Sequence, residues 1–395
     1  MLQNSQKIAV GELQIGMYVE SLDRPWLETE FLFQGLRIDS EDDLARIRAA
    51  ARYAYVSAAD DELGGLDPQS EPAPVAPEMA NDRRPRTFSE ELGTARLIRD
   101  QAKIFVDTVE ADLREGRTAN LDGAEDIVGQ MMASVARHPD ALVWFTNLKN
   151  RDAYTAEHSM NVCMLAIGLA THIGDSDARI REMGVGALLH DVGKIRVPEQ
   201  VLNKPGKLTE SELAEMRRHP EYGYDILKSG SNLSADSLDV VLSHHERMNG
   251  TGYPRGLTGD RIGHYSQLVA IADVYDAITS NRVYQRGRSA AEALRIMQTS
   301  PGEFNDELLA RFAENLGAYP PGSVVELNTG EVGLIMPNRE DKPRPTVLII
   351  LDHKKRRYFP QRMRDLTRFP KFEIARVLPT GSHDVDVDYY AEGFE

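Results

Sequence analysis

The chain has 395 residues and a formal net charge of −16, and this length predicts two or three domains, because one core seldom exceeds roughly 250–300 residues. The negative charge argues against a nucleic-acid polymer as the partner, since such binding needs clustered positive charge, but it leaves room for a small anionic ligand. Without a run of about 18 apolar residues or a signal-peptide core, the sequence predicts a cytoplasmic protein that does not span a membrane.

Residues 1–65 are predicted to form a small β-rich domain. Short runs rich in β-branched and aromatic residues are broken by glycines, which is typical of strands joined by turns. These runs are KIAVGEL, GMYVESL, FLFQGLRI and ARYAYVSA. Between the last two, residues 40–43 predict the start of a short helix with Leu44 and Ile47 on its apolar face. Residues 66–87 contain five prolines and few apolar residues, which predicts an extended linker.

Helical periodicity begins at Phe88, with Ser89 as the predicted N-cap. Residues 88–141 are predicted to form a helical connector that ends with a second helix over residues 122–138. The residues expected on the buried face of its first helix are Leu97, Ile104, Phe105, Val109 and Leu113. Residues 142–318 continue the helical pattern and show no alternation of strand and helix, so we expect an all-α bundle and not a doubly wound sheet.

Residues 319–395 are predicted to form a β-rich C-terminal appendage, because SVVELNTG, EVGLIMPN and TVLIILDH have strand character with turn residues between them. The acidic tail DVDVDYYAEGFE is expected to be frayed. The predicted fold class is therefore a multidomain, mainly α protein with small β-rich appendages at both ends. The one cysteine, Cys163, lies in an apolar run and is expected to be a buried, unreactive thiol.

Histidines and aspartates gather in the helical part. Of the ten histidines in the chain, five belong to the set His158, His190, Asp191, His219, His244, His245 and Asp273. Imidazole and carboxylate together suit Mn, Fe, Ni or Zn. A carboxylate has two oxygens and can join two ions, so Asp191 is the expected bridge of a two-metal phosphodiesterase centre. Such a centre lowers the pKa of a bound water from 15.7 to about 7 and supplies a hydroxide.

The segments around these residues resemble the HD-GYP family, a branch of the HD phosphohydrolases. The resemblance covers about residues 142–318 and rests on HSMNV, LLHDVGKIRVPEQVLNKPGKLT, HPEYGYDIL, HHERMNGTGYP and IADVYDAITSNRVY. It implies hydrolysis of cyclic di-GMP to linear pGpG, and often onward to GMP, at a non-haem iron or manganese centre. Residues 1–65 also resemble a small N-terminal domain of some family members.

The resemblance assigns roles to particular positions. One ion would be held by His158, His190, Asp191 and Asp273, and the other by Asp191, His219, His244 and His245. Asp191 and Lys194 would be the catalytic residues, and Lys194 would sit near the scissile phosphate and offset its charge. The other expected substrate contacts are Asp276, Arg282, Tyr284 and Gly252-Tyr253-Pro254. Two interpretations of this GYP tripeptide stay open: a tight turn, and a mobile rim that touches the ligand or a partner protein.

The sequence departs from the family pattern at three places. Tyr154 stands where some members have a Glu four residues before the first ligand, which predicts two ions per chain and not three. Gln285 replaces a basic residue, and Met248-Asn249-Gly250 replaces Trp-Asp-Gly. Two other functions stay open: a cyclic di-GMP receptor or scaffold that acts through the GYP face, and a broader nucleotidase. The sequence also leaves open the oligomeric state, including a homodimer, and the signal sensed by the N-terminal domain.

Overall fold

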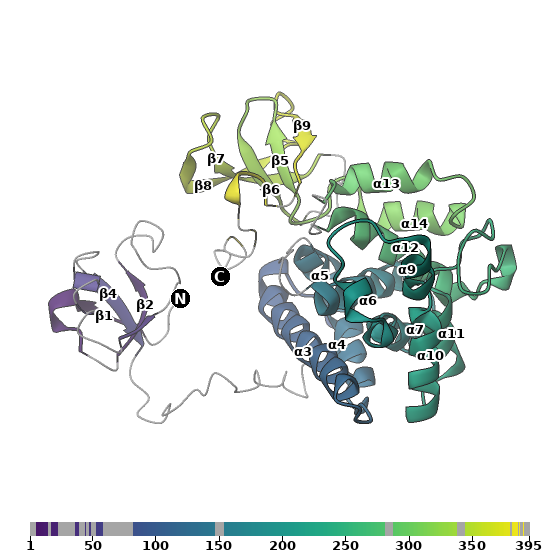
Figure 1. Ribbon diagram of the computed structural model, residues 1–395. Helices are drawn as coiled ribbons and strands as arrows, with labels where there is room; N and C mark the ends of the chain where they lie inside the picture. Colours follow the sequence, from purple (N-terminus) through teal and green to yellow (C-terminus); the bar gives the residue numbers. More distant parts are fainter. Residues whose placement is uncertain are drawn as a thin grey trace. The chain divides into compact units, whose positions relative to one another are not determined.

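The structure is a computed structural model, and it forms two compact units, Met1–Glu71 and Pro72–Glu395 (Figure 1). It describes residues 5–14, 17–22, 36–38, 44, 47–48, 53–57, 82–146, 154–280, 287–337, 344–379, 381–385, 387 and 390. The two units divide within the predicted linker, of which residues 66–81 lie outside the described part. The mainly α, multidomain fold predicted from the sequence is confirmed.

The first unit contains a four-stranded antiparallel sheet. Its strands are β1 (Ser5–Ala9), β2 (Tyr18–Leu22), β3 (Leu36–Arg37) and β4 (Tyr53–Ser57), in the order β1-β4-β2-β3. A 3-10 turn, η1 (Val10–Glu12), follows β1. Leu44 and Ile47 are buried in the small core of this unit, together with Val19 and Val56, as expected. The predicted start of their helix, residues 40–43, lies outside the described residues.

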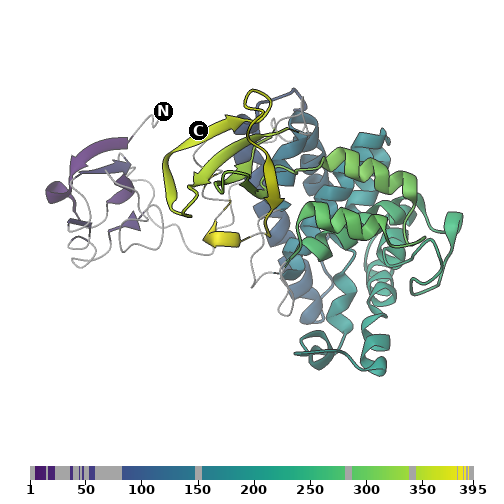
Figure 2. The same ribbon diagram turned by 90° about the horizontal axis from the view of Figure 1, so that it is seen from above.

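The second unit is a bundle of helices built around α6 (Figures 1 and 2). The helices are α3 (Phe88–Arg114), α4 (Ala124–Arg137), α5 (Pro139–Thr146), α6 (Tyr154–Ile173), α7 (Asp177–Leu188), α8 (Glu199–Leu202), α9 (Glu210–Met216), α10 (His219–Gly230), α11 (Ala235–Ser243), α12 (His264–Thr279), α13 (Ala290–Gln298) and α14 (Asp306–Leu316), with 3-10 turns η3 (Val192–Arg196) and η4 (Gly259–Arg261). α6 packs against α7 on one side and α12 on another. Cys163 on α6 is fully buried, as expected, and burial raises the pKa of its thiol.

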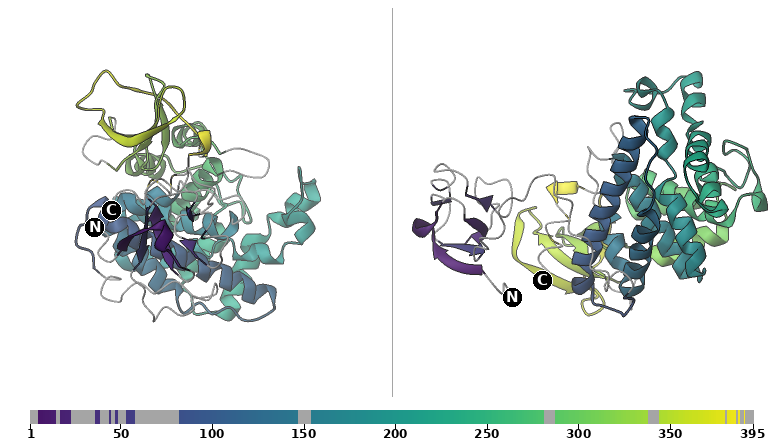
Figure 3. Two further views of the ribbon diagram at one scale, coloured as in Figure 1. Left: turned by 90° about the vertical axis from the view of Figure 1, so that its left-hand side faces the viewer. Right: turned by 90° about the horizontal axis from the view of Figure 1, so that it is seen from below.

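The long helix α3, which runs beside α4 (Figure 3), differs from the prediction in its cap and its buried face. Thr87, not Ser89, is the N-cap, and it forms a capping box with Glu90. Leu97 and Ile104 are 40% and 38% exposed. The residues that face the core are Ala95, Ile98, Ala102, Val106 and Val109. Of the five predicted residues, Val109 is buried, and Phe105 and Leu113 are partly buried against the core. Alanines let neighbouring helices approach closely, so a pattern drawn from large apolar residues alone finds only part of this face.

The C-terminal part is a five-stranded antiparallel sheet in the order β8-β7-β6-β5-β9. Its strands are β5 (Val324–Leu327), β6 (Val332–Ile335), β7 (Thr346–Leu351), β8 (Arg357–Asp365) and β9 (Ile374–Val377). The first three strands were predicted, and β8 and β9 were missed. Alternate side chains serve two cores: Leu334 and Leu348 join the core of the helices, whereas Val347 and Ile349 form a smaller core within the sheet.

The expectation of a frayed acidic tail is wrong for its described residues. Val385, Val387 and Tyr390 are at most 8% exposed and pack into the core shared with the helices. The apolar residues that alternate with the aspartates anchor this segment. Among the described residues, none of the helices combines the length and the apolar character needed to cross a membrane.

Candidate metal centre

Several separate segments bring the predicted ligands together inside the helical bundle. His158 lies on α6, His190 and Asp191 follow α7, His219 opens α10, His244 and His245 follow α11, and Asp273 lies on α12. All are buried except His245, whose side chain is 18% exposed. A tight cluster of imidazoles and carboxylates therefore sits where these segments meet.

The ligand atoms fall into two groups, each with its atoms within 4.8 Å of one another. One group is Asp191, His219, His244 and His245, and the other is His158, His190 and Asp273. Asp191 lies between them. Its Oδ2 is 3.4 Å from His190 Nε2 and 3.7 Å from His158 Nε2, and its Oδ1 is 3.3 Å from His219 Nε2. The two oxygens of one carboxylate thus face different groups.

Hydrogen bonds behind four of the rings aim them at the cluster. Nδ1 of His190, His219 and His244 lies 2.7, 2.8 and 2.9 Å from the carbonyl oxygen three residues earlier. Nδ1 of His158 lies 2.8 Å from Oδ2 of Asp276. A ring that donates through Nδ1 presents Nε2 as an acceptor, which is the form that binds a metal.

Two inner atoms of the cluster lack a hydrogen-bond partner in the described part of the chain. Among the described residues, His190 Nε2 and Asp191 Oδ1 have no hydrogen-bond partner although both are buried, and such an atom costs about 1–3 kcal/mol. His219 Nε2 and His244 Nε2 face each other at 3.3 Å. Two nitrogens held that close by their outer hydrogen bonds suit a cation beside them. The residues present therefore fit divalent metal ions.

Burial opposes ionisation of both cluster carboxylates, but their neighbours outweigh it. Lys194 and the adjacent imidazoles hold the pKa of Asp191 well below its ordinary value. The hydrogen bond from His158, with the nearby His245, does the same for Asp273. Both side chains are thus charged near pH 7, as carboxylate ligands must be.

Burial also decides the state of most of the imidazoles. It lowers the pKa of His219 to about 4 and those of His244 and His245 well below the ordinary value of 6.5. His158 differs, because burial is outweighed by the bonds to Asp273 and Asp276, which raise its pKa to about 9. In the metal-free protein the ring of His158 is therefore protonated on both nitrogens near pH 7, and a binding ion must displace the proton on Nε2.

Asp276, predicted as a substrate contact, lies behind His158 instead. It is 1% exposed, and its Oδ2 accepts hydrogen bonds from His158 Nδ1 at 2.8 Å and Ser280 Oγ at 3.1 Å. Its Oδ1 accepts a bond from Asn161 Nδ2 at 3.0 Å. A carboxylate engaged in this way orients the imidazole, and the sequence pattern gave no signal for the role of Asn161.

Lys194 lies in η3, directly after the HD dipeptide, and its ammonium group bonds to Asp191 Oδ2. Its side chain is 24% exposed, against 2% for Asp191, so a cation stands at the open edge of the cluster. Gly193 is required beside it, since a Cβ there would lie 2.0 Å from the carbonyl oxygen of His219. The other predicted phosphate contacts, Arg282 and Tyr284, lie outside the described residues.

The GYP tripeptide packs tightly against the cluster, which favours the tight-turn interpretation over a mobile rim. The ring of Tyr253 lies 4.6 Å from that of His245 at an interplanar angle of 33°. The backbone N–H of Tyr253 donates to the His245 carbonyl at 3.2 Å. The guanidinium of Arg217 covers the tyrosine ring at 5.4 Å. Tyr253 therefore supports the ring of His245.

Glu246 anchors the loop that carries this tripeptide, a role that the sequence analysis missed. It is 2% exposed and accepts hydrogen bonds from the backbone N–H groups of Arg255 at 2.7 Å and Leu257 at 2.9 Å. The available signal was an acid directly after the histidine pair, followed by a glycine-rich loop rich in free N–H groups.

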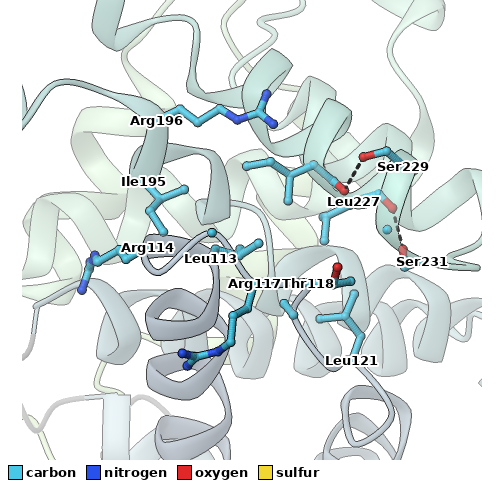
Figure 4. A pocket seen from close by; sticks show the side chains of 14 residues that line it. Leu113, Arg114, Arg117, Thr118, Leu121, Ile195, Arg196, Leu227, Ser229 and Ser231 are labelled. Atoms are coloured by element: carbon cyan, nitrogen blue, oxygen red, sulfur yellow. Dashed lines mark hydrogen bonds between the residues drawn. The ribbon is translucent and has the colours of Figure 1, made fainter.

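A pocket of about 430 Å³ opens at the far end of η3, between the ends of α3 and α10 (Figure 4). Its polar groups are largely paired within the protein. Arg114 bonds to Glu110, Arg117 bonds to Asp112, and the Ser231 hydroxyl donates to a carbonyl of α10. The pocket shares no residue with the ligand cluster.

A helical bundle with a buried cluster of imidazoles and carboxylates around an HD dipeptide defines a metal-dependent hydrolase of the HD class. A family model described as HD domain matches residues 140–308. A second, described as a domain of unknown function (DUF3391), matches residues 5–124 and extends past the linker into the helical unit.

Known relatives agree with this class. The chain is 38% identical over 373 residues to a cyclic di-GMP phosphodiesterase of Pseudomonas aeruginosa, covering 92% of this chain and 89% of the relative. It is 34% identical over 181 residues to the 3'3'-cGAMP-specific phosphodiesterase 1 of Vibrio cholerae, covering 45% and 42% of the two chains. The solved structure of an HDG"Y"P protein from Bdellovibrio bacteriovorus shares the fold, with a TM-score of 0.50, 19% identity and coverage of 79% and 99%. The chain belongs to the HD-GYP family and is a metal-dependent phosphodiesterase.

Proposed function

We propose that the protein hydrolyses cyclic di-GMP to linear pGpG with two divalent ions, iron or manganese, held by the His and Asp cluster. The observation that carries the proposal is the pair of ligand groups with Asp191 between them. A relative that matches 92% of this chain is named for cyclic di-GMP hydrolysis, which supports the substrate. The imidazole-rich ligand set supports transition metals over magnesium or calcium.

The assignment of ligands follows the two groups. One ion is assigned to His158, His190, Asp191 and Asp273, and the other to Asp191, His219, His244 and His245. When bound, the ions activate a water as the nucleophile and offset charge on the phosphate. Lys194 holds Asp191 and presents its ammonium group at the open edge, where it stabilises negative charge on the reacting phosphate.

The number of ions is argued from the sequence. Tyr154 precedes His158 by four residues, which is about one turn of an α-helix. A phenol with a reference pKa near 10 is a poor substitute for a carboxylate ligand. We therefore expect two ions per chain, and we expect pGpG to accumulate before GMP appears, because a third ion is not there to hold the linear product.

A second substrate is favoured by one specific observation. A relative named for 3'3'-cGAMP is 34% identical to this chain over 181 residues. Cyclic di-GMP and 3'3'-cGAMP differ in one base, whereas the metal ligands act on the shared phosphodiester. The groups described at the cluster therefore do not separate the two substrates, and the assay must include both.

The test uses the full chain, purified without oxygen, with its metal content measured before and after chelation. We expect about two ions per chain. Because the relative that matches 92% of this chain is named for cyclic di-GMP, we expect faster hydrolysis of cyclic di-GMP than of 3'3'-cGAMP. Chromatography of the products measures both rates. Tight binding of cyclic di-GMP without turnover would identify a receptor instead. Three ions per chain would refute the two-ion assignment.

Lys194→Ala separates the role of the lysine from that of the ligands. We expect this variant to keep its metal and lose rate, whereas Lys207→Ala, at an exposed position outside the cluster, should change neither quantity. If Lys194→Ala loses metal in proportion to its loss of rate, Lys194 supports the site and does not act on the phosphate.

A further inference from the structure

The C-terminal sheet reverses the charge of the protein. Between Arg344 and Arg376 the chain has ten Lys and Arg against three Asp and Glu, a formal charge of +7, within a chain whose net charge is −16. The remaining residues therefore sum to −23. Such a concentration of positive charge has no part in the metal cluster, whose ligands all lie between residues 158 and 273.

Many of these charges point into solvent on one edge of the sheet. The exposed basic residues on and around β8 are Lys354, Arg356, Arg357, Arg362, Arg368 and Lys371; we call them the basic edge. Arg362 stacks on Tyr358 at 4.8 Å, and Arg357 has no ion pair among the described residues. These two side chains are free to meet an acidic ligand.

Apolar side chains are exposed within the same edge. Met363 is 56% exposed and Phe369 is 48% exposed, the two highest values for large hydrophobic side chains in the described part of the chain. Both lie next to an exposed arginine, at positions 362 and 368. Apolar side chains left open among charges are typical of surfaces that bind another molecule.

The strand β8 also offers its backbone. It is the terminal strand of the sheet and pairs with β7 on one side, and no other strand of the described residues pairs with it. An edge strand of nine residues presents unpaired N–H and C=O groups that can accept an added strand. A hollow of about 650 Å³ at one end of the sheet, lined by Arg356, Arg357 and Tyr358 and also by Glu331 and Asp352, gives room for a side chain next to β8.

We propose that the basic edge binds an extended acidic peptide segment of a partner protein, which adds as a strand to β8. The exposed arginines and lysines of the basic edge attract glutamates and aspartates, and Met363 and Phe369 take the apolar residues between them. A short peptide suits this surface better than a nucleic acid, because the charge of −23 on the remaining residues repels a long polyanion. Nucleic acids also cannot pair with the open backbone of β8.

The test measures binding of a fluorescein-labelled peptide of alternating glutamate and valine, about ten residues long to match a strand, to the full chain by anisotropy. Arg357→Glu with Arg362→Glu should weaken binding by about tenfold or more, because two attractions become repulsions. The matched control is Lys207→Glu with Arg295→Glu, which changes the net charge equally at exposed positions elsewhere and should leave binding unchanged.

Met363→Ser should also weaken binding while leaving the charge unchanged, and Arg368→Glu with Lys371→Glu gives an independent variant if the first pair alters folding. All variants should keep the metal content and hydrolysis of the parent chain. Equal binding by the two charge-changed pairs, or absence of peptide binding to the parent chain, would overturn the proposal. Tighter binding of a single-stranded oligonucleotide that displaces the peptide would overturn it as well.

Discussion

Replacing Asp276 by Asn tests whether this buried carboxylate holds His158 in its ligand orientation. The change keeps the shape of the side chain and removes its charge. Asp276 accepts hydrogen bonds from His158 at 2.8 Å, Asn161 at 3.0 Å and Ser280 at 3.1 Å. An asparagine has one acceptor oxygen, so its NH₂ group must face either the N–H of His158 or the NH₂ of Asn161, and both of these are donors.

The size of the effect follows from this conflict. Loss of the carboxylate partner of a metal-binding histidine typically costs about 10–100-fold in metal affinity or activity, which corresponds to about 1.4–2.8 kcal/mol. We expect Asp276→Asn to weaken Mn²⁺ binding within this range when chelator-treated protein is titrated in a calorimeter. Asp260→Asn removes the same charge from an exposed position and should bind Mn²⁺ like the parent chain.

A different outcome would support the role first predicted from the sequence. If Asp276→Asn binds Mn²⁺ normally and keeps kcat while KM for cyclic di-GMP rises, then Asp276 contacts the substrate. The positioning role would then be wrong, and the buried position of Asp276 would have to open during binding.

Three further changes test the scaffold and the centre. Asp191→Ala should abolish hydrolysis and lower metal content, because one side chain faces both ligand groups; full occupancy by elemental analysis would refute this. Glu91→Ala should lower the free energy of unfolding by about 3–5 kcal/mol, because it leaves the buried Arg137 without its carboxylate; an unchanged denaturant midpoint would contradict this. A chain beginning at Asp82, whose carbonyl bonds to Arg137, should still bind metal and hydrolyse substrate; a folded, metal-loaded but inactive product would show that the N-terminal unit completes the site.

The cluster of histidines and aspartates was accessible from sequence because its chemistry is carried by residue type and order. The pairs His190-Asp191 and His244-His245 present ligands together wherever the chain places them, and the structure brings both pairs into the two groups as expected. Asp276 shows the limit of this reasoning. Its carboxylate has the chemistry of either a ligand partner or a substrate contact, and only its position behind His158 separates the two.

The fold shows the same division. The helices and the apolar strands β5, β6 and β7 follow from periodicity, because their side chains alternate between core and solvent or between two cores. β8 was missed because its sequence, RYFPQRMRD, is rich in arginine and contains proline. An edge strand pairs on one side only, as β8 does with β7, so it tolerates proline and charged residues that hide its apolar pattern.

The GYP loop shows why a glycine belongs next to the ligand pair. A Cβ at Gly252 would lie 2.4 Å from the N of Arg247 and 2.5 Å from both the Cα of Glu246 and the carbonyl oxygen of His245. All three are backbone atoms, so they can yield only if the main chain that carries His245 moves. The close approach also sets the distance at which the loop packs its tyrosine on the ligand ring.

We therefore expect Gly252→Ala to lower metal content and hydrolysis together, with the loss falling on the group that contains His245. Gly93→Ala on α3 is the matched control, because a Cβ there has open space and alanine should stabilise the helix by about 0.5–1 kcal/mol. Elemental analysis of both variants measures their metal content, and the thermal midpoint measures their stability. If Gly252→Ala keeps full metal content and rate, the loop accommodates the methyl group without displacing His245, and the tight packing of this loop does not hold the ligand in place.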